Sequence, residues 1–332
     1  MRLFTVRYGD DAQTDRQLND ERLLALIRFD GRATAESDPR ICPVALKELG
    51  DTATAEIWRG GRPVQTGFAE GIYHASDGQA LFLQLRLDEY APDALQPLTA
   101  VAYRRLFAKA RALGYPHALR IWNYFPAINQ DCQGLERYRA FCAGRHQALM
   151  AELAESELRL PAASAIGTRG GALQLYALAA REPGMQIENP RQVSAFRYPP
   201  QYGRRSPSFS RAVLKDWGDG QQHLYISGTA SIVGHASLHR ELLPQLDETL
   251  ANLEALLAEA NRRSAAKLAI ALLKIYVRPE LDLAPLRERI ARAFGAETPL
   301  LFLRADICRR ELLIEIEGLA TSAASSPSGL AS

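Results

Sequence analysis

The chain has 332 residues, of which 47% are hydrophobic and 23% charged, a composition typical of folded globular proteins. Lysines and arginines number 40 against 38 aspartates and glutamates, so the formal net charge of +2 favours no polyanionic partner such as a nucleic acid. The four cysteines lack the spacing of a zinc site or a disulfide framework. No apolar run reaches the roughly 18 residues of a membrane span. The N-terminal residues become polar before they could form the apolar core of a signal peptide. We therefore expect a cytoplasmic protein without a membrane anchor, a structural metal or a nucleic-acid partner.

Strand-like and helix-like patterns alternate in the first half of the chain. Alternation of apolar and polar residues predicts strands over residues 1–6, 81–87 and 118–122. Apolar residues recur with helical spacing over 98–113, and Gly114 is expected to end that helix. A second helix is predicted over about 135–153.

Arg145 interrupts the apolar stripe of the second predicted helix. One interpretation is an arginine at the edge of the core, whose hydrocarbon stem is covered while its charged end reaches water. The other is a cation directed at a buried anionic ligand. The pattern alone leaves both interpretations open.

An Ala-, Ser- and Gly-rich segment, residues 158–171, predicts a boundary between two domains, residues 1–157 and 172–320. A strand and a proline-rich loop open the second domain, and the order β-β-α-β-α-β-β then predicts a mixed sheet with two helices on one face. The expected strands are 172–179, 212–217, 223–227, 268–277, 300–304 and 311–319, and the expected helices are 246–263 and 284–294. The Ser/Ala-rich tail, 321–332, is expected to be disordered.

Two glutamates alternate with isoleucines near the end of the chain, in the run Ile314-Glu315-Ile316-Glu317. On a strand both carboxylates lie on one face, and a sheet covered by helices on its other face can expose them to water. If apolar neighbours instead enclose one glutamate, its pKa rises and it can act as a general acid, while its partner can be structural. The pattern leaves both alternatives open.

Three other segments contain candidate binding residues. Arg204 and Arg211 lie near a turn and could hold carboxylates bidentately, although such arginines are commonly solvated. The segment 225–235 is rich in glycine and small hydroxyl residues, which suits either a close backbone approach to a ligand or an ordinary tight turn. Cys308 has arginines nearby that could lower its thiol pKa, or it is simply a small core residue. These features suit an anionic small molecule and proton transfer, and do not name a reaction.

Several motifs in the second half resemble the RidA/YjgF imine-deaminase family. They are Ser206–Ala212, Ser227-Gly228, Glu248–Leu253, Lys274–Arg278 and Ile314–Glu317. The arginine that family deaminases have at the start of the penultimate strand falls on or near Leu300, and the following loop is longer and contains Cys308. These departures argue against simple imine deamination.

Longer segments extend over nearly all of residues 1–320: RIWNYFPAIN at 120–129, YRAFCAGR at 138–145, and the segments 202–212, 226–235 and 304–318. Through them the chain is similar to the chorismatases, especially the bifunctional type that supplies hydroxybenzoates for xanthomonadin pigment and ubiquinone. The resemblance implies an α+β fold with two RidA/YjgF-like domains, each a mixed β-sheet with helices packed on one face. It also implies a pocket mainly in the C-terminal domain.

The same resemblance implies the chemistry. Glu315 matches the catalytic glutamate of the family, which would protonate the enolpyruvyl methylene of chorismate and release pyruvate. Cys308 matches a cysteine of the benzoate-forming members, which favours 3-hydroxybenzoate with some 4-hydroxybenzoate as products. The expected substrate-binding residues are Tyr202, Arg204, Arg211, Gly228, Ala230, Arg304 and Arg145. No metal, organic cofactor or obligate protein partner is expected.

Two other functions stay open at this point. An imine or enamine deaminase would keep Glu315 but needs the missing arginine. A non-catalytic sensor of small aromatic acids would gain nothing from a buried acidic group, which repels an anionic ligand when ionised.

Overall fold

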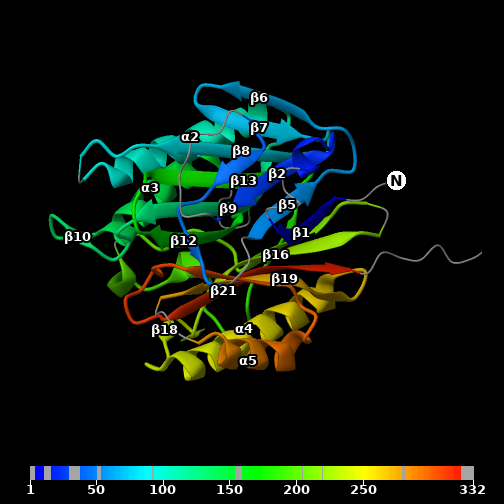
Figure 1. The fold of residues 1–332 in the computed structure, drawn as a ribbon. Coiled ribbons are helices and arrows are strands. Elements are labelled where there is room, and N and C mark those ends of the chain that lie inside the picture. Colours follow the sequence, from blue (N-terminus) through cyan, green and yellow to red (C-terminus); the bar gives the residue numbers. More distant parts are fainter. Residues whose placement is uncertain are drawn as a thin grey trace, which may run out of the picture.

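Two large β-sheets face each other, and each has two helices on its outer face (Figure 1). The computed structural model describes residues 4–10, 16–29, 38–50, 54–91, 93–153, 159–203, 205–218, 220–278 and 282–322. This arrangement confirms the predicted α+β class, with helices on one face of each sheet. None of the helices in the described ranges is both long enough and apolar enough to cross a membrane.

The first sheet has six strands in the order β12-β9-β13-β8-β7-β6. They are β6 (Gln65–Ala69), β7 (Ile72–Ser76), β8 (Ala80–Leu87), β9 (His117–Pro126), β12 (Ala162–Thr168) and β13 (Leu173–Ala180). Helices α2 (Leu95–Ala112) and α3 (Arg137–Glu152) cover it, because apolar residues at helical spacing, such as Leu106 and Phe141, pack against the sheet. Gly114, at φ +82°, takes the left-handed conformation that lets the chain leave α2.

The second sheet has seven strands in the order β14-β15-β16-β21-β19-β20-β4. They are β4 (Lys47–Glu48), β14 (Met185–Ile187), β15 (Ala212–Asp216), β16 (Gln222–Thr229), β19 (Leu268–Val277), β20 (Leu300–Arg304) and β21 (Ile314–Ser322). Helices α4 (Leu242–Arg263) and α5 (Ala284–Phe294) cover its outer face. Strand β4 comes from the first half of the chain and pairs antiparallel with β20, so the two halves are joined at this edge.

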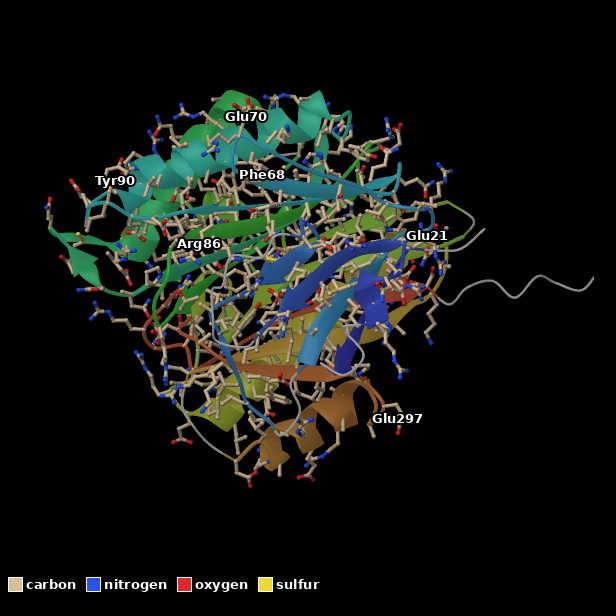
Figure 2. The ribbon with its side chains drawn as sticks, turned by 45° about the horizontal axis from the view of Figure 1, so that its top comes forward. Glu21, Phe68, Glu70, Arg86, Tyr90 and Glu297 are labelled. Atoms are coloured by element: carbon tan, nitrogen blue, oxygen red, sulfur yellow. The ribbon has the colours of Figure 1, made fainter. Side chains whose placement is uncertain are left out.

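A third sheet, of four strands in the order β1-β5-β2-β3, packs into the core between the large sheets. Its strands are β1 (Thr5–Asp10), β2 (Leu23–Arg28), β3 (Ile41–Pro43) and β5 (Thr54–Arg59). The central core is aromatic: Trp58 is buried, and Trp122 stacks on Tyr176 with ring centroids 4.6 Å apart. At the periphery, by contrast, Phe68 and Tyr90 project outward (Figure 2).

Two short hairpins and two short 3₁₀ helices complete the described elements. The hairpins are β10 (Asp131–Cys132) with β11 (Leu135–Glu136), and β17 (Ile232–Val233) with β18 (Ala236–Ser237). The 3₁₀ helices are Ala195–Arg197 and Pro200–Tyr202.

The structure corrects the predicted domain boundary at 158–171. Residues 162–168 form β12, which is buried along its whole length and pairs parallel to β9. Its alanines, Ser164 and Gly167 fit a space between the two large sheets, so the small side chains reflect close packing and not a linker. Strand β13 also belongs to the first sheet, so after β4 the chain returns to the second sheet only at β14.

The ends of the chain are described only in part. Residues 1–3 of the predicted first strand lie outside the described residues, and β1 begins at Thr5. Thr321 and Ser322, predicted as the start of the tail, continue β21, and residues 323–332 lie outside the described residues.

Candidate active site

A cavity of about 490 Å³ is lined by side chains from both halves of the chain. The first half contributes the β10–β11 hairpin and the start of α3, and the second contributes β16, β21 and the loop after β20. Five residues predicted from the sequence meet there: Arg211, Gly228, Ala230, Cys308 and Glu315. Apart from Glu315, four arginines and three acidic side chains line the cavity, a surplus of one positive charge.

Glu315 is enclosed although it lies on the sheet face opposite α4 and α5. Its side chain is buried because the first sheet, and not water, covers that face, so the solvated alternative is wrong. Burial, followed by the nearby charge of Glu317, raises the pKa of Glu315 to about 8. Within the described residues one hydrogen bond reaches its carboxyl, from Cys308 Sγ to Oε2 at 3.9 Å. Glu315 is therefore protonated at neutral pH and can donate a proton.

Gly228 makes room for the Glu315 carboxyl. A β-bulge interrupts the pairing of β16 with β21 between Ile226 and Thr229, and Gly228 lies within it. A Cβ atom added at Gly228 would lie 1.9 Å from Glu315 Oε1, closer than any non-bonded contact permits. The Gly228 N–H donates to Ser164 Oγ at 3.0 Å, which fixes this backbone segment against β12. The predicted close backbone approach is thus to the acid itself.

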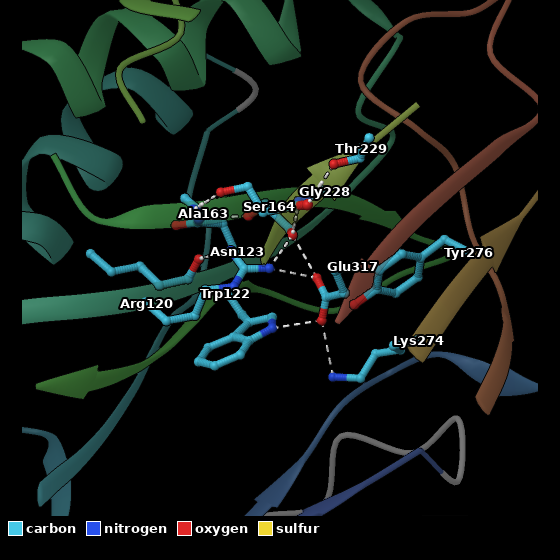
Figure 3. Close-up of polar contacts among 12 residues, drawn as sticks. Arg120, Trp122, Asn123, Ala163, Ser164, Gly228, Thr229, Lys274, Tyr276 and Glu317 are labelled. Atoms are coloured by element: carbon cyan, nitrogen blue, oxygen red, sulfur yellow. Dashed lines mark hydrogen bonds and ion pairs between the residues drawn. The ribbon is translucent and has the colours of Figure 1, made fainter. Parts of the chain in front are cut away.

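Glu317, two residues along β21, has four donors around its carboxylate (Figure 3). Trp122 Nε1 and Lys274 Nζ lie 2.7 and 3.2 Å from Oε1, and Arg120 Nη2 lies 2.8 Å from Oε2. Ser164 Oγ donates to Oε2 at 2.5 Å. Burial alone would raise the pKa of Glu317, but Lys274 and Arg120 outweigh it and the pKa lies below its usual value. This glutamate is held ionised.

Cys308 is a neutral thiol. Its side chain lies beside Glu315 and packs with a small apolar cluster that includes Ala230 and Ile232. Burial, followed by the proximity of Glu315, raises the thiol pKa, and the opposing effect of Arg309 is smaller. Of the two interpretations of Cys308, the structure supports a small residue packed against apolar neighbours, and not a thiol whose pKa the arginines lower.

Arg211 presents a cation to the cavity from the residue before β15. Its Nη2 donates to Tyr198 Oη at 2.7 Å and to the Val193 carbonyl at 2.8 Å. The guanidinium also lies near the faces of Tyr198 and Phe209, with Cζ 5.5 and 5.3 Å from the ring centroids. No acidic side chain in the described ranges forms a salt bridge with Arg211. Its charge is available to an anionic ligand.

Arg145 lies one layer behind the cavity wall. Its side chain is 1% exposed, so the interpretation as an arginine reaching water is wrong. The guanidinium Cζ lies 4.9 Å from the ring centroid of Phe141 and 5.8 Å from that of Phe209, which itself lines the cavity. Arg145 thus lies behind Phe209, and direct contact of Arg145 with a ligand remains a prediction.

The structure does not place the remaining predicted residues, Arg304, Tyr202 and Arg204, in the wall of the cavity. Arg304 ends β20, opposite Lys47 of β4, and is not among the described residues that line the cavity. Tyr202 closes the 3₁₀ helix Pro200–Tyr202, whose Gln201 lines the cavity. Arg204 lies outside the described residues. Substrate binding by these three residues stays a prediction.

The cavity is also lined by residues that were not predicted as site residues, among them Tyr138, Tyr198, Phe209 and Arg309. Arg309 Nη1 donates to the His235 carbonyl at 3.0 Å and to Ser237 Oγ at 2.9 Å, which ties the loop after β20 to the β17–β18 hairpin. Phe209 and Arg309 lie beside residues that the sequence singled out, and that adjacency was the available signal. Tyr198 lies in an aperiodic proline-rich loop, where the sequence contains no pattern that marks a site residue.

Among the described residues no group of three or more His, Cys, Asp or Glu side chains is arranged to hold a metal ion. The chemical groups at the site include a buried proton donor, a neutral thiol and an arginine. They suit proton transfer to an anionic small molecule.

Comparisons with known proteins identify the family of the chain. A family model described as chorismatase FkbO/Hyg5-like, N-terminal, matches residues 56–179. A 3-hydroxybenzoate synthase of Streptomyces hygroscopicus is 37% identical over 279 residues, covering 80% of this chain and 81% of that protein. A chorismatase of Streptomyces rapamycinicus is 36% identical over 314 residues, covering 90% and 93%. A crystal structure of a chorismatase matches with a TM-score of 0.84 at 34% identity, covering 97% of this chain and 99% of that one. The chain belongs to the chorismatase family of enzymes.

Proposed function

We propose that this protein cleaves chorismate to pyruvate and 3-hydroxybenzoate, with some 4-hydroxybenzoate. The observation that carries the proposal is the Glu315 carboxyl, buried and protonated, in a cavity with a surplus of positive charge. A dianionic substrate would enter such a cavity favourably, and it would meet an acid that does not repel it.

In the proposed reaction Glu315 transfers its proton to the methylene carbon of the enolpyruvyl group. The ether carbon becomes an oxocarbenium ion, so the bond between the ether oxygen and the ring is weakened. Breaking that bond releases pyruvate, whose carbonyl oxygen is the former ether oxygen. Chorismate contains the atoms of one hydroxybenzoate and one pyruvate, so the reaction consumes neither water nor an oxidant. The proton donor is a side chain of this protein, and proton transfer by a positioned acid commonly contributes about 10²–10⁴-fold to a rate.

The part of the cavity wall formed by Cys308 and Ala230 is proposed to decide which product the ring of chorismate gives. If water attacked the oxocarbenium ion, the product beside pyruvate would be a dihydroxycyclohexadiene carboxylate. If the neighbouring ring hydroxyl instead attacks the ring carbon as its bond to the ether oxygen breaks, the hydroxyl proton passes to the Glu315 carboxylate. The arene oxide that forms can then open to a hydroxybenzoate. A neutral thiol packed with Ala230 and Ile232 makes this wall apolar and disfavours water there, which supports the internal route. The name of the Streptomyces hygroscopicus relative, a 3-hydroxybenzoate synthase, also supports this product.

Arg211 is proposed to bind one substrate carboxylate, since guanidinium groups bind carboxylates through charge-assisted hydrogen bonds. Gly228 and Ala230 leave room for the ring beside Glu315. Arg204, Arg304, Tyr202 and Arg145 keep their predicted supporting roles, and supply of hydroxybenzoate to pigment or ubiquinone synthesis is the pathway we infer.

Incubation of the purified protein with chorismate alone tests this proposal. Pyruvate would be followed over time, the aromatic products would be separated by chromatography, and chorismate without protein would correct for spontaneous breakdown. Pyruvate with 3-hydroxybenzoate in equal amounts is the expected result. Pyruvate with only the dihydroxydiene would overturn the assigned ring fate. No pyruvate from folded protein would overturn the proposed activity.

A further inference from the structure

Four charged side chains meet in the core between the three sheets. Lys274 Nζ of β19 lies 2.7 Å from Glu56 Oε2 of β5 and 3.2 Å from Glu317 Oε1 of β21. Arg120 Nη2 of β9 lies 2.8 Å from Glu317 Oε2. All four side chains are 1–4% exposed. We call Glu56, Arg120, Lys274 and Glu317 the charged quartet.

The charged quartet is electrically balanced, with two cations and two anions. Glu315 is a fifth ionisable group on the same face of β21, and neither cation of the quartet is left over to pair with it. An additional negative charge in this core would be uncompensated, and desolvation makes such a charge costly. The neutral form of Glu315 is therefore the one that the surrounding charges permit.

A second link between the quartet and Glu315 is mechanical. Ser164 Oγ accepts hydrogen bonds from Arg120 Nη2 at 2.5 Å and from the Gly228 N–H at 3.0 Å. Its own proton is then directed to Glu317 Oε2 at 2.5 Å, which requires Glu317 to be an acceptor (Figure 3). Gly228 in turn packs on the Glu315 carboxyl. The position of the acid is thus connected to the quartet through one serine and one glycine.

We propose that the charged quartet is the positioning device of the acid: it keeps Glu317 ionised and thereby holds Glu315 protonated and packed against Gly228. Its importance for turnover rests on the proposed function. The quartet does not touch the reacting atoms, and it acts through Glu315.

The other groups that face Glu315 do not replace this device. The titratable and charged neighbours are Glu317 on β21, Tyr276 on β19, Arg120 on β9, Cys308 after β20 and Arg211 before β15. Arg120 is bound to Glu317. Arg211 keeps its charge, but its lowering effect on the pKa of Glu315 is smaller than the raising effects of burial and Glu317. Burial raises the pKa values of Tyr276 and Cys308, so both are neutral near pH 7. Glu317 is the anion that remains beside Glu315.

The first test is the pH profile of pyruvate release by Glu317→Gln. This substitution leaves the quartet with one surplus positive charge, so Glu315 should ionise at lower pH. The decline of activity with rising pH should move down by roughly one to three pH units. Glu56→Gln makes the same charge change at the far end of the quartet and should give a smaller displacement. A loss of activity that is uniform over pH, without displacement of the profile, would indicate a merely structural role and overturn the proposal.

A second variant guards against simple misfolding. Glu317→Gln combined with Lys274→Met returns the quartet to electrical balance, so the profile should move back toward that of the wild type. A profile that stays displaced, or moves further down, would contradict the charge-balance argument.

Infrared spectroscopy on protein with ¹³C-labelled glutamate gives a readout that does not need turnover. The carbonyl band of a protonated carboxyl that disappears in Glu315→Gln belongs to Glu315, and its titration can be followed in wild type and Glu317→Gln. Titration at lower pH in Glu317→Gln supports the proposal even if chorismate proves not to be the substrate. Titration at an unchanged pH overturns it even if chorismate is cleaved.

Discussion

Two glutamates on one strand, Glu315 and Glu317, have nearly the same exposure, 4% and 3%, and opposite protonation states. Glu317 is surrounded by two cations, an indole N–H and a hydroxyl, which together stabilise its charge. Glu315 has a thiol and a glycine beside it. Burial acts on both residues in the same direction, so the available partners decide which one ionises. In this site the ionised neighbour also helps to keep the acid protonated.

The largest effect is expected for Glu315→Gln, which removes the protonated member of the pair. Glutamine keeps the shape of the side chain but cannot donate the proton, so kcat for pyruvate release should fall by about 10²–10⁴-fold. Binding of 3-hydroxybenzoate, measured by calorimetry, should be retained. Glu297→Gln, at an exposed position (Figure 2), is the matched control and should behave as wild type. Turnover near the wild-type rate in Glu315→Gln would remove this residue from the mechanism.

A second prediction concerns the glycine that distinguishes the surroundings of Glu315. In Gly228→Ala the new methyl group would collide with Glu315 Oε1, so the carboxyl must move. A displacement of this size should lower kcat by about 10²-fold. Gly170→Ala is the control, because a Cβ there meets open space. Steady-state kinetics of both variants would decide, and equal activities would show that the Glu315 carboxyl has no fixed position.

Arg211→Ala tests substrate binding separately from proton transfer by Glu315. Loss of one charge-assisted contact should raise KM for chorismate by an amount equivalent to about 1.5–3 kcal/mol, with a smaller effect on kcat. Arg292→Ala, at an exposed position on α5, serves as the control for loss of one positive charge. An unchanged KM would mean that Arg211 does not contact the substrate.

The smallest expected effect on rate is that of Cys308→Ala. The thiol does not supply the catalytic proton, so pyruvate release should change little. The product should shift toward the dihydroxydiene, because a methyl group leaves space for water beside Glu315. Chromatography of the products measures the ratio. The same product mixture as wild type would refute the role assigned to Cys308.

Much of the second half could be predicted from local pattern. Strands 268–277 and 300–304 and helix 284–294 have the predicted bounds, because apolar periodicity and flanking polar residues define them. Several site residues, including Gly228 and Glu315, were also identifiable, because they lie in contiguous motifs.

The partners of Glu317 could not be predicted in this way. Arg120 and Lys274 lie within apolar strands of different sheets, and Glu56 lies in a third, so their meeting depends on how the sheets pack. The buried strand β12 was misread for a related reason. Its small residues are explained by the facing sheet, which no local pattern reveals.

The most direct test of the central claim is the pH dependence of kcat/KM for pyruvate release from chorismate by the wild-type protein. If protonated Glu315 is the acid, kcat/KM should be steady below its pKa, about 8, and fall by about tenfold per pH unit above it. A rate that rises through pH 8 would require a deprotonated base instead. That result would contradict the account.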